Sequence, residues 1–179
     1  MGSRFNAQTR RVASLHHPPD FRISLRDNYI FGTLLLPNAP LRYFFSEGTT
    51  AYLALKATQH QLGPRLYREK LAGYRQRPLR HVNSPALADV RRPDAVDDAY
   101  RYVAAPLQLL ALERQIGEKH TWRWLRLLAL AAPARTDYDF LLSSLRLSGL
   151  PASALAAWTR RFTSGGPAMQ QALLELTQP

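Results

Sequence analysis

The chain has 179 residues, no cysteine, 46% hydrophobic residues and a formal net charge of +11. This length and composition support one folded domain with a packed core, and the lack of cysteine excludes disulfide bonds and thiolate zinc sites. The arginines that carry the charge are spread along the chain without a nucleic-acid-binding signature, so neither a nucleic acid nor an anionic membrane is the expected partner.

Residues 1–40 are expected to form a basic, loosely structured segment, separate from the rest of the chain. Arginines surround His16-His17-Pro18-Pro19, a run that interrupts any helix. The start of the chain has no apolar core of a signal peptide, which favours a cytoplasmic location. No apolar run is long enough to cross a bilayer, so no transmembrane segment is expected.

Residues 41–179 predict an all-α domain, built as an irregular bundle of helices. Apolar residues recur at helical spacing from Leu41 to Leu55. Gly63-Pro64 is expected to end this helix and begin the next. Residues 76–95, which contain three prolines, predict a loop with one helical turn near 86–90.

The second half of the domain is expected to contain a long helix followed by shorter ones. The long helix is predicted over 97–116, bent or begun near Pro106 and ended by Gly117. A helix over 121–131 should bury Trp122, Leu125, Leu128 and Ala129. Thr136 is expected to cap a helix over 138–147, and two more helices should follow over 151–162 and 167–176.

The stretch 44–53, Phe-Phe-Ser-Glu-Gly-Thr-Thr-Ala-Tyr-Leu, resembles the helix that carries the third zinc ligand in gluzincins, the aminopeptidase N-like zinc metallopeptidases. Further along the chain, Tyr102, Ile116-Gly117, the T-x-x-D-F motif at 136–140 and Trp158 follow in the order typical of that family. The resemblance covers residues 43–163. It implies a fold like the C-terminal helical lobe of a gluzincin catalytic domain, with Glu47 as metal ligand and Tyr102, in preference to Tyr100, as catalytic tyrosine.

The H-E-x-x-H motif that supplies the other two zinc ligands and the general base is absent from this sequence. At the spacing of the family, the two histidines would fall on Ser24 and Asn28, and the general base on Leu25. The His16-His17 pair cannot replace them, because zinc needs two histidines one helical turn apart. Zinc is therefore expected in the parent family but not in this chain alone.

The residues favour three functions in descending order. The first is a truncated or degenerate metallopeptidase domain, inactive alone, whose partner is an N-terminal peptidase segment; an exposed apolar surface near Leu41 to Leu55 is then expected. The second is a helical pseudoenzyme that binds proteins or peptides in a cleft between the Glu47 and Tyr102 helices. The third is a basic nucleic-acid binder. Without the resemblance, Glu47 is an ordinary acid in a first helical turn and Tyr102 a half-buried core aromatic.

Overall fold

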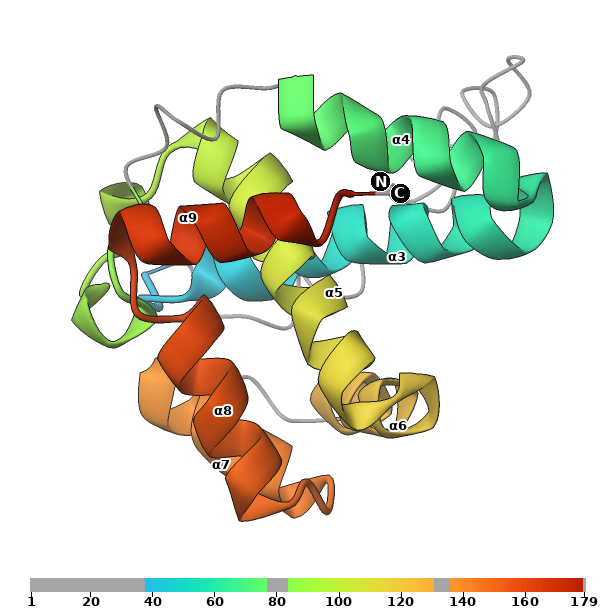
Figure 1. The fold of residues 1–179 in the computed structure, drawn as a ribbon. Helices are drawn as coiled ribbons and strands as arrows, with labels where there is room; N and C mark the ends of the chain where they lie inside the picture. Colours follow the sequence, from blue (N-terminus) through green and yellow to red (C-terminus); the bar gives the residue numbers. More distant parts are fainter. Residues whose placement is uncertain (1–37, 77–83, 131–135, 179) are drawn as a thin grey trace, which may run out of the picture.

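The computed structural model describes residues 38–76, 84–130 and 136–178. Within these ranges the regular structure is entirely helical, which confirms the all-α prediction (Figure 1). Almost all of the loosely structured segment predicted for residues 1–40 lies outside the described residues. None of the helices in the described ranges has the length and apolar character needed to cross a membrane.

The first two helices form a hairpin whose turn lies at Gly63. A π-helical segment, η1 (Phe44–Gly48), continues directly into α3 (Thr49–Ala57) and then into a second one, η2 (Thr58–Leu62). Gly63 has a φ of 88°, a conformation that favours glycine, and α4 (Pro64–Gln76) begins at the next residue. The predicted break at Gly63-Pro64 is thus confirmed.

The connection to the next long helix carries two short 3-10 turns, η4 (Leu87–Asp89) and η5 (Pro93–Ala95). The sequence predicted the first turn and missed the second. This connection is anchored to the C-terminal helices, because the Leu87 amide donates to the Thr163 carbonyl at 2.9 Å and the Gly166 amide to the Ser84 carbonyl at 3.1 Å.

The centre of the molecule is the long predicted helix, which has two parts. A third π-helical segment, η6 (Tyr100–Ala104), runs into α5 (Ala105–Ile116), and Pro106 lies in the first turn of α5. Gly117, at a φ of 83°, ends the helix as predicted. Every side chain from Ala105 to Leu112 is buried, so neighbouring helices cover α5 on all sides over these residues.

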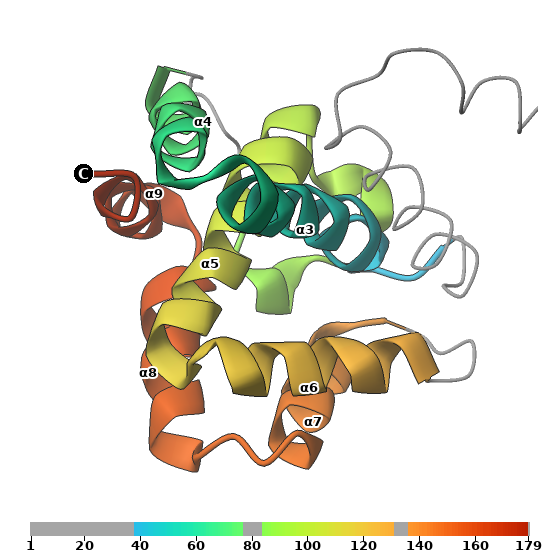
Figure 2. The same cartoon turned by 90° about the vertical axis from the view of Figure 1, so that its right-hand side faces the viewer.

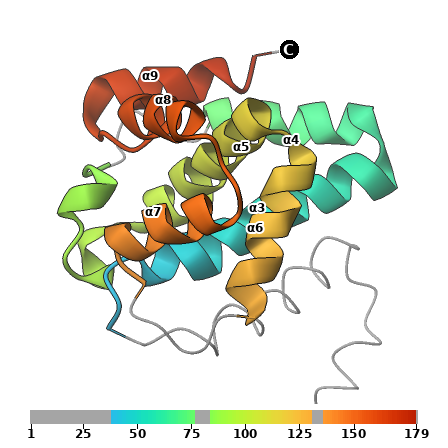
Figure 3. The ribbon, with the colours of Figure 1, turned by 90° about the horizontal axis from the view of Figure 1, so that it is seen from below.

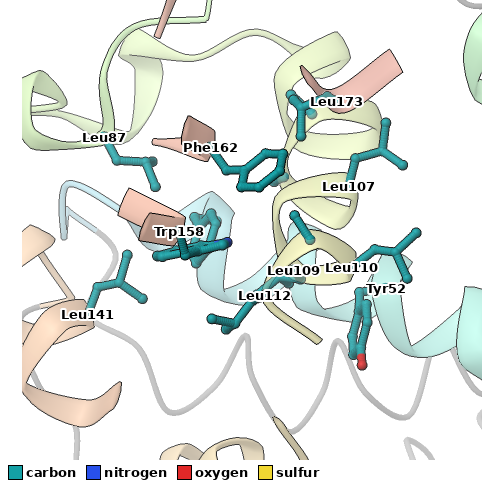
Figure 4. Packing of buried hydrophobic residues seen from close by; sticks show 14 of the residues in the cluster. Tyr52, Leu87, Leu107, Leu109, Leu110, Leu112, Leu141, Trp158, Phe162 and Leu173 are labelled. Atoms are coloured by element: carbon teal, nitrogen blue, oxygen red, sulfur yellow. The ribbon is translucent and has the colours of Figure 1, made fainter. Parts of the chain in front are cut away.

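Four further helices follow: α6 (Glu118–Leu130), α7 (Tyr138–Leu147), α8 (Ala152–Phe162) and α9 (Gly166–Glu175). α6, α8 and α9 pack against α5, and α7 packs against α6 and α8. α6 and α7 lie together at one end of the molecule, and α9 returns towards α4 (Figures 2 and 3). Figure 4 shows Trp158 and Phe162 of α8 beside the leucines of α5. The core also contains a hydrogen-bonded glutamine: Gln108 accepts from the Tyr100 hydroxyl at 3.1 Å and donates to the Phe162 carbonyl at 2.7 Å.

Three local predictions were wrong. α6 begins at Glu118 instead of Thr121. Trp122, which was expected in the core, is 38% exposed. Trp124 is fully buried instead, and its indole donates to the Ser144 hydroxyl at 2.9 Å. The N-cap of α7 is Asp137, whose side chain accepts from the Phe140 amide at 2.9 Å. Thr136 lies one residue before this cap and is buried.

The apolar surface expected between Leu41 and Leu55 is absent as well. The large apolar side chains of this stretch lie in the core of the described domain, each with no more than 8% of its surface exposed: Leu41, Phe44, Phe45, Tyr52, Leu53 and Leu55. Phe45, for example, packs edge-on against Phe140 of α7, with ring centroids 5.5 Å apart.

Candidate functional site

Glu47 and Tyr102 each occupy a π-helical segment, η1 and η6. In η1 every residue except Glu47 is buried, and in η6 Tyr102 is the most exposed residue. A π-helical turn inserts one extra residue into a helix, and such turns are frequent at functional sites. In both segments the wide turn places one polar side chain at the surface while its neighbours pack inside.

The two segments lie against each other, with Gly48 at the point of closest approach. A Cβ built on Gly48 would lie 2.6 Å from the Cβ of Ala105, so only glycine fits at this crossing without a shift. This contact brings Glu47 and Tyr102 together although they lie far apart in the sequence, and the Glu47 carboxylate lies near enough to the Tyr102 hydroxyl to raise its pKa. The two helices are in direct contact at this point, and the cleft expected between them stays a prediction.

Burial of the Tyr102 hydroxyl is the main cause of a pKa above the ordinary tyrosine value. The negative charge of Glu47, the hydrogen bond to it and the charge of Asp98 raise this pKa further, while Arg101 lowers it. The phenol therefore keeps its proton at neutral pH and remains a hydrogen-bond donor. Since 42% of the Tyr102 surface is exposed, a ligand can reach it from solvent.

The side chains beside Tyr102 are held in place by several contacts. The Arg101 guanidinium lies 3.6 Å from the centre of the Tyr43 ring and forms an ion pair with Asp98 at 3.2 Å. Tyr100, the alternative to Tyr102 in the sequence, is only 1% exposed and its hydroxyl faces Gln108 in the core. Only Tyr102 of these two tyrosines is therefore placed to meet a ligand at Glu47.

The described residues do not complete a zinc site around Glu47. Nowhere in the described ranges do three or more histidine, aspartate or glutamate side chains gather as a metal would require. The described histidines are engaged elsewhere, with His60 3.0 Å from Glu118 and His120 3.0 Å from the Ile116 carbonyl. The positions that correspond to H-E-x-x-H, Ser24 to Asn28, and the pair His16-His17 lie outside the described residues.

A second polar cluster, which the sequence analysis missed, joins α3 to α5. The ammonium of Lys56, a residue only 2% exposed, lies 2.8 Å from a Glu113 carboxylate oxygen and 2.7 Å from the Gln59 amide oxygen. The Tyr52 hydroxyl donates to the other Glu113 oxygen. A charged residue one helical turn after Tyr52, on the same apolar face, is the signal that could have indicated this cluster.

Two hollows lie elsewhere on the described surface. One, of about 510 Å³, lies between the η4 region and the start of α7 and is lined in part by Arg91, Asp137 and Asp139. Another, of about 400 Å³, lies between α4 and the residues after α9. Neither of these two hollows is lined by Glu47 or Tyr102.

Comparisons with models of protein families, with curated proteins and with solved structures gave no match for this chain. The resemblance to gluzincins therefore rests on the motif residues alone, and the geometry around Glu47 and Tyr102 is described without a related structure.

Proposed function

We propose that this domain is a truncated or degenerate gluzincin-type metallopeptidase scaffold that keeps one metal-ligand position, Glu47, and one oxyanion-binding tyrosine, Tyr102. The observation that carries the proposal is the proximity of these two residues, which belong to separate helices that touch at Gly48 and Ala105. Their pairing follows from the motif resemblance, whereas nothing in composition or periodicity requires it.

Without the other zinc ligands, Glu47 and Tyr102 can still bind a peptide group through hydrogen bonds. A protonated phenol donates a hydrogen bond to a carbonyl oxygen, and it stabilises the negative charge that develops there during peptide cleavage. The Glu47 carboxylate accepts from a peptide N–H or from an amino group. Because the described residues supply Glu47 as the sole candidate ligand, hydrolysis by the family mechanism is not expected from this domain alone.

The proposal is tested by supplying the missing half in trans. Hydrolysis of an aminoacyl anilide would be measured with the chain alone, and again with zinc and a gluzincin fragment that ends after its H-E-x-x-H helix. We expect no turnover alone and measurable turnover in the mixture. Removing the oxyanion donor by Tyr102→Phe should lower that turnover about 100-fold or more.

Tyr138→Phe is the matched control, because Tyr138 is a partly buried tyrosine of α7 whose hydroxyl lies 3.2 Å from Thr163. It should leave turnover unchanged. Turnover by the mixture that survives both Tyr102→Phe and Glu47→Gln would contradict the assigned roles. A well-folded chain that yields no turnover in any mixture would contradict the truncated-enzyme form of the proposal.

One observation favours the alternative, a pseudoenzyme that acts as a protein- or peptide-binding module. The apolar residues between Leu41 and Leu55 are buried, so the part of an enzyme that would normally cover them is not needed to close this core. Sedimentation of the purified chain at several concentrations tests the point. A stable monomer favours the binding module, whereas concentration-dependent association favours a domain that has lost a covering lobe.

A further inference from the structure

We propose that the exposed side of α6 is a docking surface for an acidic face of a partner protein. This α6 face consists of Lys119, Trp122, Arg123, Arg126 and Leu127, together with Leu147 at the end of α7. It is distinct from the Glu47–Tyr102 pair, because α5 lies between them: η6 precedes that helix and α6 follows it. A helix of 12 residues, such as α5, is about 18 Å long. The inference does not depend on the proposed function.

The basic residues of the α6 face form a row along the helix. Lys119, Arg123 and Arg126 follow one another at i, i+4 and i+7, a spacing that places them on one side of an α-helix, and all three are exposed. The opposite side of α6 is buried, with Thr121, Trp124 and Leu125 turned to the core. The row is therefore an outward-facing line of positive charge about two turns long.

These three cations are available to a partner. Some basic side chains elsewhere in the described structure are paired: Arg65 with Glu69 at 3.0 Å, Arg161 with Glu175 at 2.6 Å and Lys56 with Glu113 at 2.8 Å. Lys119, Arg123 and Arg126 form no side-chain hydrogen bond or ion pair with any residue of the described ranges. Glu118, the acidic residue at the start of α6, is already engaged by His60 and by the Trp122 indole.

Exposed apolar side chains border this row. Trp122 is 38% exposed, Leu127 39% and Leu147 77%, which are high values for such residues in a chain that buries its other tryptophans completely. Leu147 belongs to the same region, since a Cβ built on nearby Gly149 would lie 3.9 Å from Nη1 of Arg123. Tryptophan and arginine are enriched among the residues that dominate protein–protein binding energy, and a basic row bordered by apolar contacts fits an acidic partner.

The arrangement favours a protein over a lipid bilayer. A helix that lies in a membrane surface gathers its apolar residues on one side and its basic residues on the other. On α6, helical spacing puts Trp122 and Leu127 on opposite edges of the basic row, so both cannot enter the hydrocarbon region while the cations stay in the headgroups. Nucleic acid fits less well, because proteins that bind duplex DNA commonly neutralise six or more phosphates.

The proposal is tested with a fluorescent helical peptide whose glutamates stand at i, i+4 and i+7 with leucines beside them. Binding to the full chain would be measured by anisotropy at physiological ionic strength. The parent chain should bind this peptide, and the double charge reversal Arg123→Glu/Arg126→Glu should weaken binding about tenfold or more. Leu147→Ser, which removes an exposed contact without changing charge, should weaken it about threefold.

The matched control is Arg68→Glu/Arg75→Glu, which makes the same change in charge at exposed positions of α4. It should weaken binding less than about twofold, since its effect is limited to long-range attraction. Equal weakening by the two double variants, or no binding of the peptide to the parent chain, would overturn the proposal. Tighter binding to vesicles of phosphatidylglycerol and phosphatidylcholine, or to duplex DNA, would overturn the assigned partner class.

Discussion

Lys56 shows how a single buried charge is accommodated in this fold. Its side chain is 3% exposed, and that of its partner Glu113 is 13% exposed. Gln59 and Tyr52 supply further hydrogen bonds to the pair. Both charges are largely removed from water, so each is tolerated only because the other neutralises it. Removing one partner therefore lowers the free energy of unfolding by more than the intact pair adds to it.

Replacement of this lysine by an apolar residue of similar length, Lys56→Met, is expected to lower the free energy of unfolding by about 3 kcal/mol. The cause is the Glu113 carboxylate, which would remain buried without its cation. Urea denaturation followed by circular dichroism measures the change. Lys119→Met, the same substitution at an exposed position, should cost less than about 0.5 kcal/mol.

A double variant separates charge compensation from packing. Lys56→Met combined with Glu113→Gln removes both charges, so it should recover part of the stability lost by Lys56→Met alone. If the double variant is as unstable as the sum of its two single variants, the ion pair is not what makes Lys56 important.

At the scale of elements, the contact between η1 and η6 depends on a glycine. Gly48→Ala places a methyl group where the Ala105 methyl already lies, at a built distance of 2.6 Å. The two segments must separate, which should lower the free energy of unfolding by about 1–3 kcal/mol. Separation also weakens the hydrogen bond from Tyr102 to Glu47, so the Tyr102 pKa should fall towards the ordinary tyrosine value.

Both effects of Gly48→Ala can be measured on the same samples. Urea denaturation gives the stability, and nuclear magnetic resonance of labelled tyrosines, with Tyr102→Phe to assign the signal, gives the pKa. Adding Ala105→Gly makes room for the new methyl group and should restore the pKa even if a glycine inside α5 costs about 1 kcal/mol. A Tyr102 pKa that is unchanged in Gly48→Ala would contradict the role given to this contact.

The helix boundaries that depend on local backbone preferences could be predicted from the sequence, and features that depend on the assembled fold could not. Gly63, Gly117 and the prolines ended or began helices where expected, because their backbone preferences act locally. The π-helical segments could not be predicted, since a change in hydrogen-bond register leaves no compositional trace. Asp137, and not Thr136, caps α7, and Thr136 is buried beside it. Such burial depends on the assembled fold.

The candidate site, too, could be predicted only in part from the sequence. Glu47 and Tyr102 were singled out through motif resemblance, and the structure places them in contact. The Lys56–Glu113 pair was missed because its two members are 57 positions apart and no local pattern links them. Trp122 was wrongly assigned to the core, although Leu125 and Leu128 of the same predicted stripe are buried, since helical periodicity does not fix where the edge of the buried face lies.

For the whole molecule, buried tyrosines predict a loss of stability in alkaline solution. Burial and its hydrogen bond to Glu113 raise the pKa of Tyr52, and burial raises that of Tyr100. Both values exceed the ordinary tyrosine pKa of about 10. The unfolded chain therefore releases these protons first, and the stability contributed by the two tyrosines is complete below about pH 10 and is lost at higher pH.

Urea denaturation at increasing pH measures this dependence. Above about pH 10, two tyrosines that stay protonated only in the folded state should lower the free energy of unfolding by up to about 2.7 kcal/mol per pH unit. Tyr100→Phe removes one of them and should reduce the slope by about half. A slope in Tyr100→Phe equal to that of the parent chain would show that the other titrating groups are responsible.

The burial of α5 on all sides has a consequence for synthesis on the ribosome. Residues 105–112 emerge before α8 and α9, whose Trp158, Phe162, Met169 and Leu173 lie in the same buried core. Until those last helices have been made, part of the central helix has no apolar partner and is open to chaperones or to aggregation. The native core therefore closes only after α9 has been translated, and truncations that remove α9 should be found in the insoluble fraction.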